Sequence, residues 1–342
     1  MARKKGPKKA LAPFEGSDDS RSLGALIFRY FEWMRIRGYS EATVTRAWEV
    51  LGVFLRWCAE RAVIQARDVT KPMLERYQRH LYHYRKRNGE PLSFRGQHSQ
   101  LCVIQGLFRF LAKQNYILYN PASDLELPKV GKRLPRFVLT ATEVDQVLNQ
   151  ADVSTDKGIR DRAIMETLYS TGIRRSELIN LKLFDIDDER GIITIREGKG
   201  RRDRMIPIGE RALAWVRKYL DDVRPTLMIE PDNMILFLTV EGEALGQSHL
   251  TKLVRTYIKA SCIGKTGSCH IFRHTMATLM LEGGADIRFI QQMLGHAELT
   301  STEVYTQVSL NKLKEIYLAT HPGAKLRQKT SREASEKPEK KA

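Results

Sequence analysis

Six side chains suited to phosphate chemistry lie in four short segments of the sequence. They are Arg174 in STGIRRSELINL (170–181), Lys199 in EGKGRRDR (197–204), His270 and Arg273 in CHIFRHTMATLML (269–281), and His296 and Tyr305 in MLGHAELTSTEVYT (293–306). Two guanidinium groups can hold the non-bridging oxygens of a phosphate through paired N–H groups. Those oxygens gain charge as the phosphorus becomes pentacoordinate, so fixed cations stabilise the transition state. The set indicates a phosphodiester site, provided that the fold brings the segments together.

Tyr305 can supply the hydroxyl nucleophile that such a site needs. It follows His296 by nine residues, and Thr300 or Ser301 can cap the short helix that carries it. Attack by the phenol gives a phosphotyrosine ester, which keeps the energy of the broken bond, so rejoining needs neither ATP nor a metal. Neighbouring cations ease loss of the phenol proton, whose ordinary pKa is about 10. The sequence has no Walker loop, no two-metal carboxylate cluster and no H-E-x-x-H motif, so we expect no cofactor and no metal ion.

Each of these residues also has a structural interpretation when it is taken alone. An arginine on a helix is usually a surface charge, and a lysine between two glycines usually belongs to a hairpin turn. A single histidine is more often structural, and a single tyrosine more often belongs to a core. The functional interpretation depends on the joint occurrence of all the pieces in this order.

The segments G-I-R-R-S-E-L, E-G-K-G-R-R-D-R, H-I-F-R-H and L-G-H followed by Tyr305 resemble the signature of the tyrosine recombinases, or phage integrases. The resemblance covers roughly residues 20–320. In its overall length and its compact N-terminal helical bundle, the chain resembles the Xer-type and mobile-element integrases of bacteria. It implies that Arg174 and Arg273 bind the phosphate, with His270 hydrogen-bonding beside Arg273. It further implies that His296 occupies the position at which members of the family have His or Trp. Lys199 would protonate the departing 5′-hydroxyl oxygen, and Tyr305 would form the 3′-phosphotyrosyl bond.

Three neighbours of these residues have less direct roles. Glu177 lies one helical turn beyond Arg174, so we expect it to orient an active-site cation from outside the site. Arg175 departs from the apolar residue usual in the family; it is either a solvent-facing charge or a further DNA contact. His274 is interpreted as structural.

These residues must be positioned by a mainly α fold with a small antiparallel β-sheet (α+β). We expect a disordered arm over residues 1–20, a helical DNA-clamp domain over 21–114, a linker over 115–139, a catalytic domain over 140–321 and a disordered basic tail over 322–342. Apolar residues at helical spacing predict four helices in the first domain, beginning at Leu23, after Ser40, at Thr70 and after Pro91. The aromatic residues of this domain are interpreted as core rather than as base-stacking platforms.

The second domain should begin with a helix at Thr140, which forms a capping-box pattern with Glu143. Helices are predicted over 159–170 and 174–181, and strands over 192–197 and 204–208, joined by the turn that carries Lys199. Further helices are expected at 210–223, 248–261, 270–282, 286–294, 301–307 and 309–319.

The chain of 342 residues carries a net charge of +17, which favours a polyanionic partner, here double-stranded DNA. Its four cysteines form no C-x-x-C pair, and we expect reduced, mostly buried thiols. No apolar segment follows the basic start MARKKGPKKA, and no run long enough to span a membrane occurs, so neither a signal peptide nor a membrane helix is expected. The predicted location is the bacterial cytoplasm, in association with the nucleoid.

The sequence therefore predicts a site-specific DNA recombinase of the integrase or resolvase type, acting through a 3′-phosphotyrosine intermediate and a Holliday junction. The resemblance implies a homo-tetramer on two DNA sites, with the helix near 309–319 passed to the adjacent subunit. Two alternatives are a type IB topoisomerase-like enzyme that relaxes supercoils, and a DNA-binding accessory protein that never cuts. The DNA target cannot be assigned, because reading bases requires knowing how a helix lies in the groove.

Overall fold

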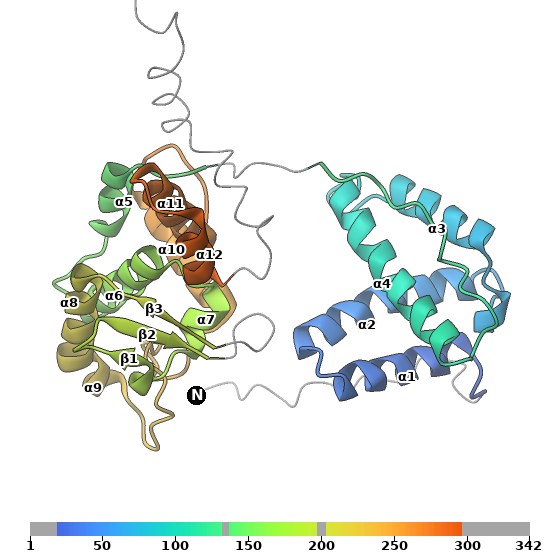
Figure 1. Ribbon diagram of the computed structural model, residues 1–342, viewed down its shortest axis with the longest axis horizontal. Coiled ribbons are helices and arrows are strands. Elements are labelled where there is room, and N and C mark those ends of the chain that lie inside the picture. The colour runs from blue at the N-terminus through green and yellow to red at the C-terminus, as the bar shows by residue number, and fades with distance from the viewer. Residues whose placement is uncertain (1–18, 132–136, 197–202, 296–342) are drawn as a thin grey trace, which may run out of the picture. The chain divides into compact units, whose positions relative to one another are not determined.

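The computed structural model describes residues 19–131, 137–196 and 203–295. The chain divides into two compact units, Met1–Lys132 and Arg133–Ala342, which we call unit 1 and unit 2 (Figure 1). The helices expected at 301–307 and 309–319, and both expected disordered termini apart from residues 19 and 20, lie outside the described residues. Each unit is described by itself.

Unit 1 is helical throughout its described elements: α1 (Leu23–Ile36), α2 (Glu41–Ala59), the short 3₁₀ turn η1 (Ala66–Asp68), α3 (Lys71–His83) and α4 (Phe94–Lys113). The four α-helices match the four predicted from the apolar spacing. Ser22, Ser40 and Ser93 cap α1, α2 and α4 by accepting a hydrogen bond from a backbone N–H three residues ahead. Gly38, with φ of 73°, follows the end of α1, where glycine adopts the left-handed conformation without steric cost.

The core of unit 1 contains most of the aromatic residues of this region. Tyr30, Phe31, Tyr77 and Phe108 are buried, which confirms their interpretation as core. The interpretation is wrong for the exposed aromatic residues of this unit, which are Tyr39, Tyr82, Tyr84, Phe94, Tyr116 and Tyr119. The first half of the expected linker also packs into this core: Ile117, Ala122 and Leu125 are buried against the helices. These apolar residues have no helical period, so composition alone does not reveal that the segment is packed.

Unit 2 combines helices with one small sheet. Its elements in chain order are α5 (Ala141–Leu148), α6 (Asp156–Thr171), α7 (Arg175–Asn180), η2 (Leu183–Asp185), β1 (Ile186–Asp187), β2 (Ile192–Ile195), β3 (Arg204–Pro207), α8 (Glu210–Lys218), η3 (Tyr219–Val223), α9 (Arg224–Leu227), α10 (Gln247–Ala260), α11 (Cys269–Glu282) and α12 (Ile287–Leu294). The capping box of Thr140 and Glu143 is formed at the start of α5. The fold class is mainly α with a minor antiparallel sheet, as predicted.

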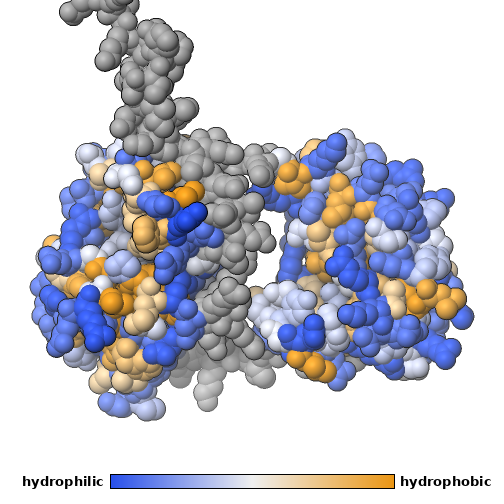
Figure 2. Space-filling model, viewed as in Figure 1, coloured by the Kyte–Doolittle hydropathy of each residue, from blue (hydrophilic) through white to orange (hydrophobic). Residues whose placement is uncertain are grey.

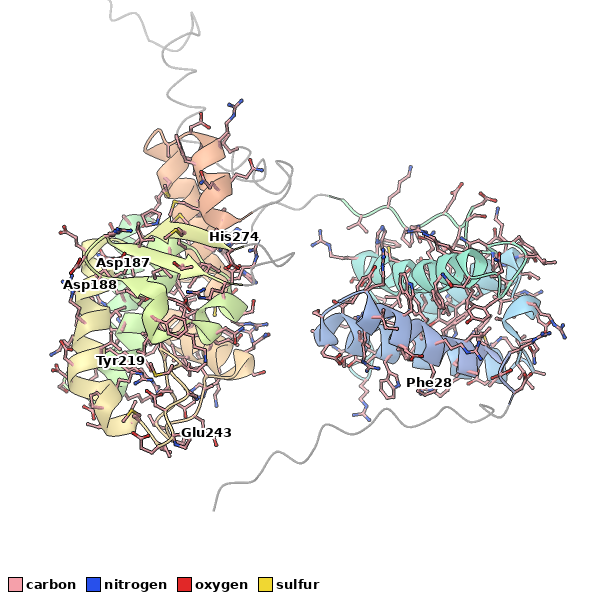
Figure 3. All side chains as sticks on the ribbon, turned by 60° about the horizontal axis from the view of Figure 1, so that its bottom comes forward. Phe28, Asp187, Asp188, Tyr219, Glu243 and His274 are labelled. Atoms are coloured by element: carbon pink, nitrogen blue, oxygen red, sulfur yellow. The ribbon has the colours of Figure 1, made fainter. Side chains whose placement is uncertain are left out.

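The sheet has the order β1-β2-β3, with Ile193 opposite Ile206 and Ile195 opposite Arg204. The two-residue strand β1 was not predicted, because so short a segment carries no alternating pattern. The helix expected over 210–223 is also interrupted: α8 passes into a π-helical turn, η3, and then into α9. Tyr219 in this turn is buried, and its hydroxyl accepts a hydrogen bond from the backbone N–H of Leu238 (Figure 3).

Helix α6 is buried along most of its length and packs against α5, α8 and α11. Its buried residues include charged side chains as well as apolar ones, so this helix lacks the one-sided pattern of a surface helix. Leu139 is also buried, and its backbone N–H donates to Thr275 Oγ1 on α11 (3.0 Å). Because α6 packs directly on α11, it positions both α11 and the turn that follows α6.

The surfaces of both units are largely hydrophilic on the face drawn in Figure 2, where apolar residues form separate small groups. All four cysteines are free; Cys58 and Cys269 are buried, whereas Cys102 and Cys262 are exposed, so the expectation of mostly buried thiols is wrong for half of them. Among the described residues, no helix is both long enough and apolar enough to span a membrane.

Candidate active site

Arg174 lies at the start of α7, directly after the turn that ends α6. This turn depends on Gly172, whose φ is 60° and at which an added Cβ would collide with Met276 Cε on α11. The turn is thus pressed against α11. The Arg174 guanidinium is about one-fifth exposed and donates from Nη1 to Glu177 Oε1 (2.8 Å) and from Nη2 to the Gly295 carbonyl (3.0 Å).

Arg273 on α11 reaches the same place from the other side. Its buried guanidinium donates from Nη1 to the Gly172 carbonyl (2.6 Å) and from Nη2 to the Leu294 carbonyl (2.8 Å). Leu294 and Gly295 are adjacent, so Arg174 and Arg273 converge on the end of α12. The fold brings together two arginines that are 99 residues apart in the chain.

His270 lies one turn before Arg273 on α11 and is exposed. Its pKa is held below the ordinary value, first by partial desolvation and then by the charges of Arg273, Arg175 and Arg174. These causes place His270 within the field of three guanidiniums. A neutral imidazole in such a position can accept or donate a hydrogen bond at a phosphate without adding charge.

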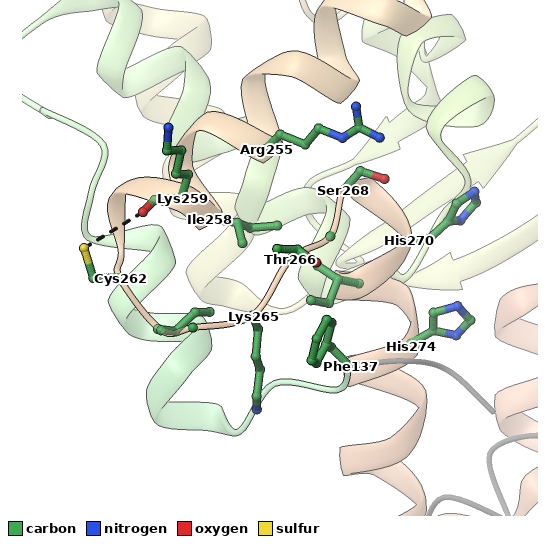
Figure 4. A pocket seen from close by; sticks show the side chains of 14 residues that line it. Phe137, Arg255, Ile258, Lys259, Cys262, Lys265, Thr266, Ser268, His270 and His274 are labelled. Atoms are coloured by element: carbon green, nitrogen blue, oxygen red, sulfur yellow. Dashed lines mark hydrogen bonds between the residues drawn. The ribbon is translucent and has the colours of Figure 1, made fainter. Parts of the chain in front are cut away.

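His274 lies one turn further along α11 and is half-buried. Burial, followed by the nearby His270 and Arg273, lowers its pKa to about 4. Both histidines line a pocket of about 870 Å³ formed with the loop between α10 and α11 and with Phe137 (Figure 4). The side chains of Arg255 and Lys259 on α10 add positive charge to this pocket.

Glu177 is the carboxylate that Arg174 and Arg204 share, in agreement with its expected role of orienting a cation of the site. It accepts from the backbone N–H of Arg174 (2.8 Å) as well as from the Arg174 guanidinium, and Arg204 donates to both of its oxygens (3.0 and 2.7 Å). Burial alone would raise the pKa of Glu177, but the hydrogen bonds and charges of Arg204 and Arg174 lower it to about 2. Glu177 is therefore ionised at neutral pH and holds Arg174 in place.

Arg204 is a site residue that the sequence patterns did not single out. It also donates from Nε to the Met293 carbonyl (3.0 Å), and its side chain is only 11% exposed. Strand β3 alternates, so Arg204 shares the inward direction of the buried Ile206 rather than that of the exposed Met205 and Pro207. That alternation in RMIP is the signal that could have identified Arg204 from the sequence.

Arg175 does not extend freely into solvent. It donates to Thr251 Oγ1 (2.6 Å) and Gln247 Oε1 (2.9 Å), both on α10. Next to it, Lys252, Arg255 and Lys259 lie along α10 and line a shallow groove with Arg175. This charge at the start of α7 therefore ties α7 to a basic helix.

The remaining predicted residues, Lys199, His296 and Tyr305, lie outside the described part of the chain. Among the residues that the structure describes, the site combines Arg174, Arg204 and Arg273 with the single carboxylate of Glu177, so it carries an excess of positive charge. Within these same ranges, no group of three or more His, Cys, Asp and Glu side chains is arranged to hold a metal ion.

The amino-acid sequence is similar to one protein family and to several tyrosine recombinases. The phage integrase family matches residues 138–312. Tyrosine recombinase XerC 2 of Ralstonia nicotianae is 47% identical over 293 residues, which cover 86% of this chain and 84% of that protein. Tyrosine recombinase XerD of Staphylococcus epidermidis is 34% identical over 224 residues, 66% of this chain and 75% of that protein.

Solved structures show the same fold. The XerH site-specific recombinase bound to its difH substrate superposes with a TM-score of 0.65 at 22% identity, over 85% of this chain and 83% of that one. A lambda integrase tetramer bound to a Holliday junction superposes with a TM-score of 0.63 at 21% identity, over 84% and 78%. With the family match and the relatives above, these findings show that the chain is an Xer-like member of the phage integrase family of tyrosine recombinases.

Proposed function

We propose that this protein is a site-specific DNA recombinase that cleaves and rejoins DNA through a 3′-phosphotyrosine intermediate and a Holliday junction. The observation that carries the proposal is the convergence of Arg174 and Arg273 on one point, with His270 beside them and a single carboxylate to balance three guanidiniums. Such an excess of fixed positive charge suits a phosphate whose oxygens gain charge during attack.

In the proposed mechanism, Tyr305 attacks the scissile phosphorus and displaces the 5′-oxygen of the next nucleotide. Lys199 donates a proton to that leaving oxygen, while Arg174 and Arg273 stabilise the pentacoordinate phosphate. His270 and His296 hydrogen-bond to the non-bridging oxygens. Attack by a 5′-hydroxyl from the partner strand then reverses the chemistry and releases Tyr305. The reaction is assigned to side chains alone, so we expect cleavage to continue in EDTA.

The DNA duplex is proposed to lie along the basic face of α10. Lys252, Arg255 and Lys259 recur on this helix beside Arg175, and Arg255 and Lys259 also line the pocket next to His270. Lysine and arginine side chains at this spacing can follow a phosphate backbone towards the reacting group.

Covalent capture on a nicked suicide duplex tests the function. The wild-type protein should form a denaturation-resistant DNA adduct, whereas Tyr305→Phe, which lacks only the attacking oxygen, should bind the duplex and form none. An adduct with the Phe variant would assign the nucleophile to another residue. Absence of an adduct with the wild type on its own site would favour the accessory-protein alternative.

The topoisomerase alternative makes a different prediction about plasmid DNA. A type IB topoisomerase relaxes supercoils without a specific sequence, whereas a site-specific recombinase requires its own site. Relaxation of a plasmid that carries no recombination site would therefore support the alternative. The Xer-like relatives favour the recombinase.

We further propose that four protomers assemble on two DNA sites, with the segment near 309–319 docking on the adjacent subunit. Leu310, Leu313, Ile316 and Tyr317 recur there at helical spacing, directly after the segment that carries Tyr305. A chain truncated after Gln307 should bind a single site but lose the higher complexes and strand exchange. Normal assembly of the folded truncated chain on two sites would exclude the exchange.

The protein is proposed to act in the bacterial cytoplasm, in association with the nucleoid, on chromosomal or mobile-element DNA.

A further inference from the structure

Three arginines bind three consecutive backbone carbonyls at the end of α12. Arg204 Nε donates to the Met293 carbonyl, Arg273 Nη2 to that of Leu294 and Arg174 Nη2 to that of Gly295. The last carbonyls of a helix have no partner within the helix and carry partial negative charge. Strand β3, α11 and the start of α7 are thereby joined at one point, directly before His296 in the chain.

Arg204 differs from the other two arginines in how its donors are used. Its Nη1 and Nη2 form a fork on the two oxygens of Glu177, and its Nε is bound to Met293. Each of its three nitrogens thus donates to an acceptor within the protein. Arg174, by contrast, is more exposed and shares Glu177 as its carboxylate partner.

We propose that Arg204 is a positioning residue for DNA cleavage: it fixes the carboxylate that holds Arg174, and it fixes the end of α12 from which His296 follows. The inference rests on the proposed function, since it assigns to Arg204 an effect on the phosphate that is exerted through Arg174. A planar fork suits this task because it holds both oxygens of a carboxylate in one plane while Nε points to a third acceptor.

The surroundings of Arg204 leave little room for another arrangement. Gly295 adopts φ of 59°, and a Cβ at this position would lie 3.0 Å from Cζ, Nε and Nη1 of Arg204. The backbone at the end of α12 therefore packs directly on the guanidinium. Burial of Glu177 also makes its partner important, because a buried carboxylate with only one arginine is less well compensated.

The test compares two forms of the scissile phosphate under single-turnover conditions. One duplex carries the natural phosphate; in the other, a methylphosphonate replaces a charged non-bridging oxygen with a neutral methyl group. Loss of a residue that acts on phosphate charge should matter less on the neutral substrate.

On natural DNA, Arg204→Met should slow cleavage by roughly 100-fold, as removal of a preorganised charge interaction does. Duplex affinity should change by no more than about threefold, because Arg204 is buried against protein acceptors.

On methylphosphonate DNA, the Arg204→Met defect should shrink to about tenfold or less, in parallel with that of Arg174→Ala. Arg204→Lys keeps the charge but loses the fork, so it should retain an intermediate rate on natural DNA. An equal defect of Arg204→Met on both substrates would contradict the proposal, as would wild-type rates in this variant. Full activity of Arg204→Lys would contradict the role of the fork.

Arg211→Met is the matched control. Arg211 also binds a buried glutamate of unit 2, Glu166 (3.0 Å), but its other donor goes to Asp145 rather than to the end of α12. Its loss should lower thermal stability and leave the cleavage rate per folded molecule unchanged on both substrates. If Arg204→Met does not fold, Arg204→Lys takes its place: its partial defect should shrink on the methylphosphonate substrate, and an equal defect on both substrates would then contradict the proposal.

Failure of the inference and failure of the proposed function are distinguishable. A wild-type protein that forms no adduct, or an Arg174→Ala variant that cleaves normally, would contradict the proposed function. An Arg174→Ala variant that behaves as expected beside an Arg204→Met variant that does not would contradict the role of Arg204 alone.

Discussion

In the described part of unit 2, two buried glutamates are each bound by two arginines, yet the two clusters differ in charge. In the α6 cluster, Glu166 accepts from Arg162 Nε and Arg211 Nε (3.0 Å each), while Arg211 also binds Asp145 (2.9 Å). Two carboxylates thus balance two arginines. In the α7 cluster, Glu177 alone faces Arg174 and Arg204, with Arg273 close by.

The remaining donors of the two clusters are also used differently. Arg162 donates to the Asn149 side chain and lies over the Trp215 ring, and Arg211 lies over Tyr169. In the α7 cluster the spare donors go to backbone carbonyls at the end of α12. The first arrangement is balanced in charge, which suits a structural role, although Arg211 and Asp145 at its edge are about half exposed. The second keeps excess positive charge at a partly exposed point, which suits an anion that arrives from outside.

Replacing the central carboxylate of the α6 cluster should have the largest effect on folding. Glu166→Ala leaves Arg162 without its charged partner and Arg211 with only Asp145, and the loss of one partner of a buried ion pair costs roughly 3–5 kcal/mol. We expect this loss in the free energy of urea unfolding. The cleavage rate per folded molecule should stay at the wild-type value. A large fall in that rate with normal stability would show that the α6 cluster is not purely structural.

The arginines of the site should show the reverse pattern. Arg174→Ala and Arg273→Ala should each raise the barrier to DNA cleavage by about 3 kcal/mol or more, by analogy with the removal of an oxyanion donor. Arg174→Ala should lower stability less than Glu166→Ala does, because Arg204 still binds both oxygens of Glu177. Single-turnover cleavage and thermal melting measure the two effects. Full cleavage activity in either variant would remove that arginine from the site.

The free energy of unfolding should depend on pH through the carboxylate of Glu177. Its folded-state pKa of about 2 lies below the ordinary value of 4.5, so the carboxylate contributes stability above pH 4.5 and loses it as the pH falls towards 2. The contribution at neutral pH is at most about 3 kcal/mol. The difference in unfolding free energy between the wild type and Glu177→Gln should therefore shrink from pH 5 to pH 3. A difference independent of pH would contradict the assigned charge state.

The smallest effect is expected at Arg175, which has neutral partners. Arg175→Met loses hydrogen bonds to Thr251 and Gln247 on α10, so stability should fall by about 1 kcal/mol. The cleavage rate should stay within a few-fold of the wild type. The salt dependence of DNA binding separates two cases: loss of one phosphate contact reduces its logarithmic slope by about 1, whereas a purely structural arginine leaves the slope unchanged.

Local signals in the sequence were enough to predict most elements of the fold. Ser40 and the pair Thr140 and Glu143 mark helix starts that the structure contains, because caps act within one turn of backbone. The spacing of apolar residues likewise predicted the helices of unit 1. The linear segments containing Arg174, His270 and Arg273 could also be identified, since their residue types and order are written in the chain.

Only the tertiary structure decided what those side chains contact. The carbonyl partners of Arg174 and Arg273 come from α12 and from the turn after α6, and Arg204 reaches Glu177 across 27 residues of chain. No local period encodes such contacts, because a guanidinium can reach acceptors on any element that packs beside it. For the same reason the burial of charged residues on α6, the exposure of Cys102 and Cys262, and the π-helical turn at Tyr219 appeared only when the elements were assembled. The sequence determined which groups could bind a phosphate; packing determined which acceptors within the protein hold them in place.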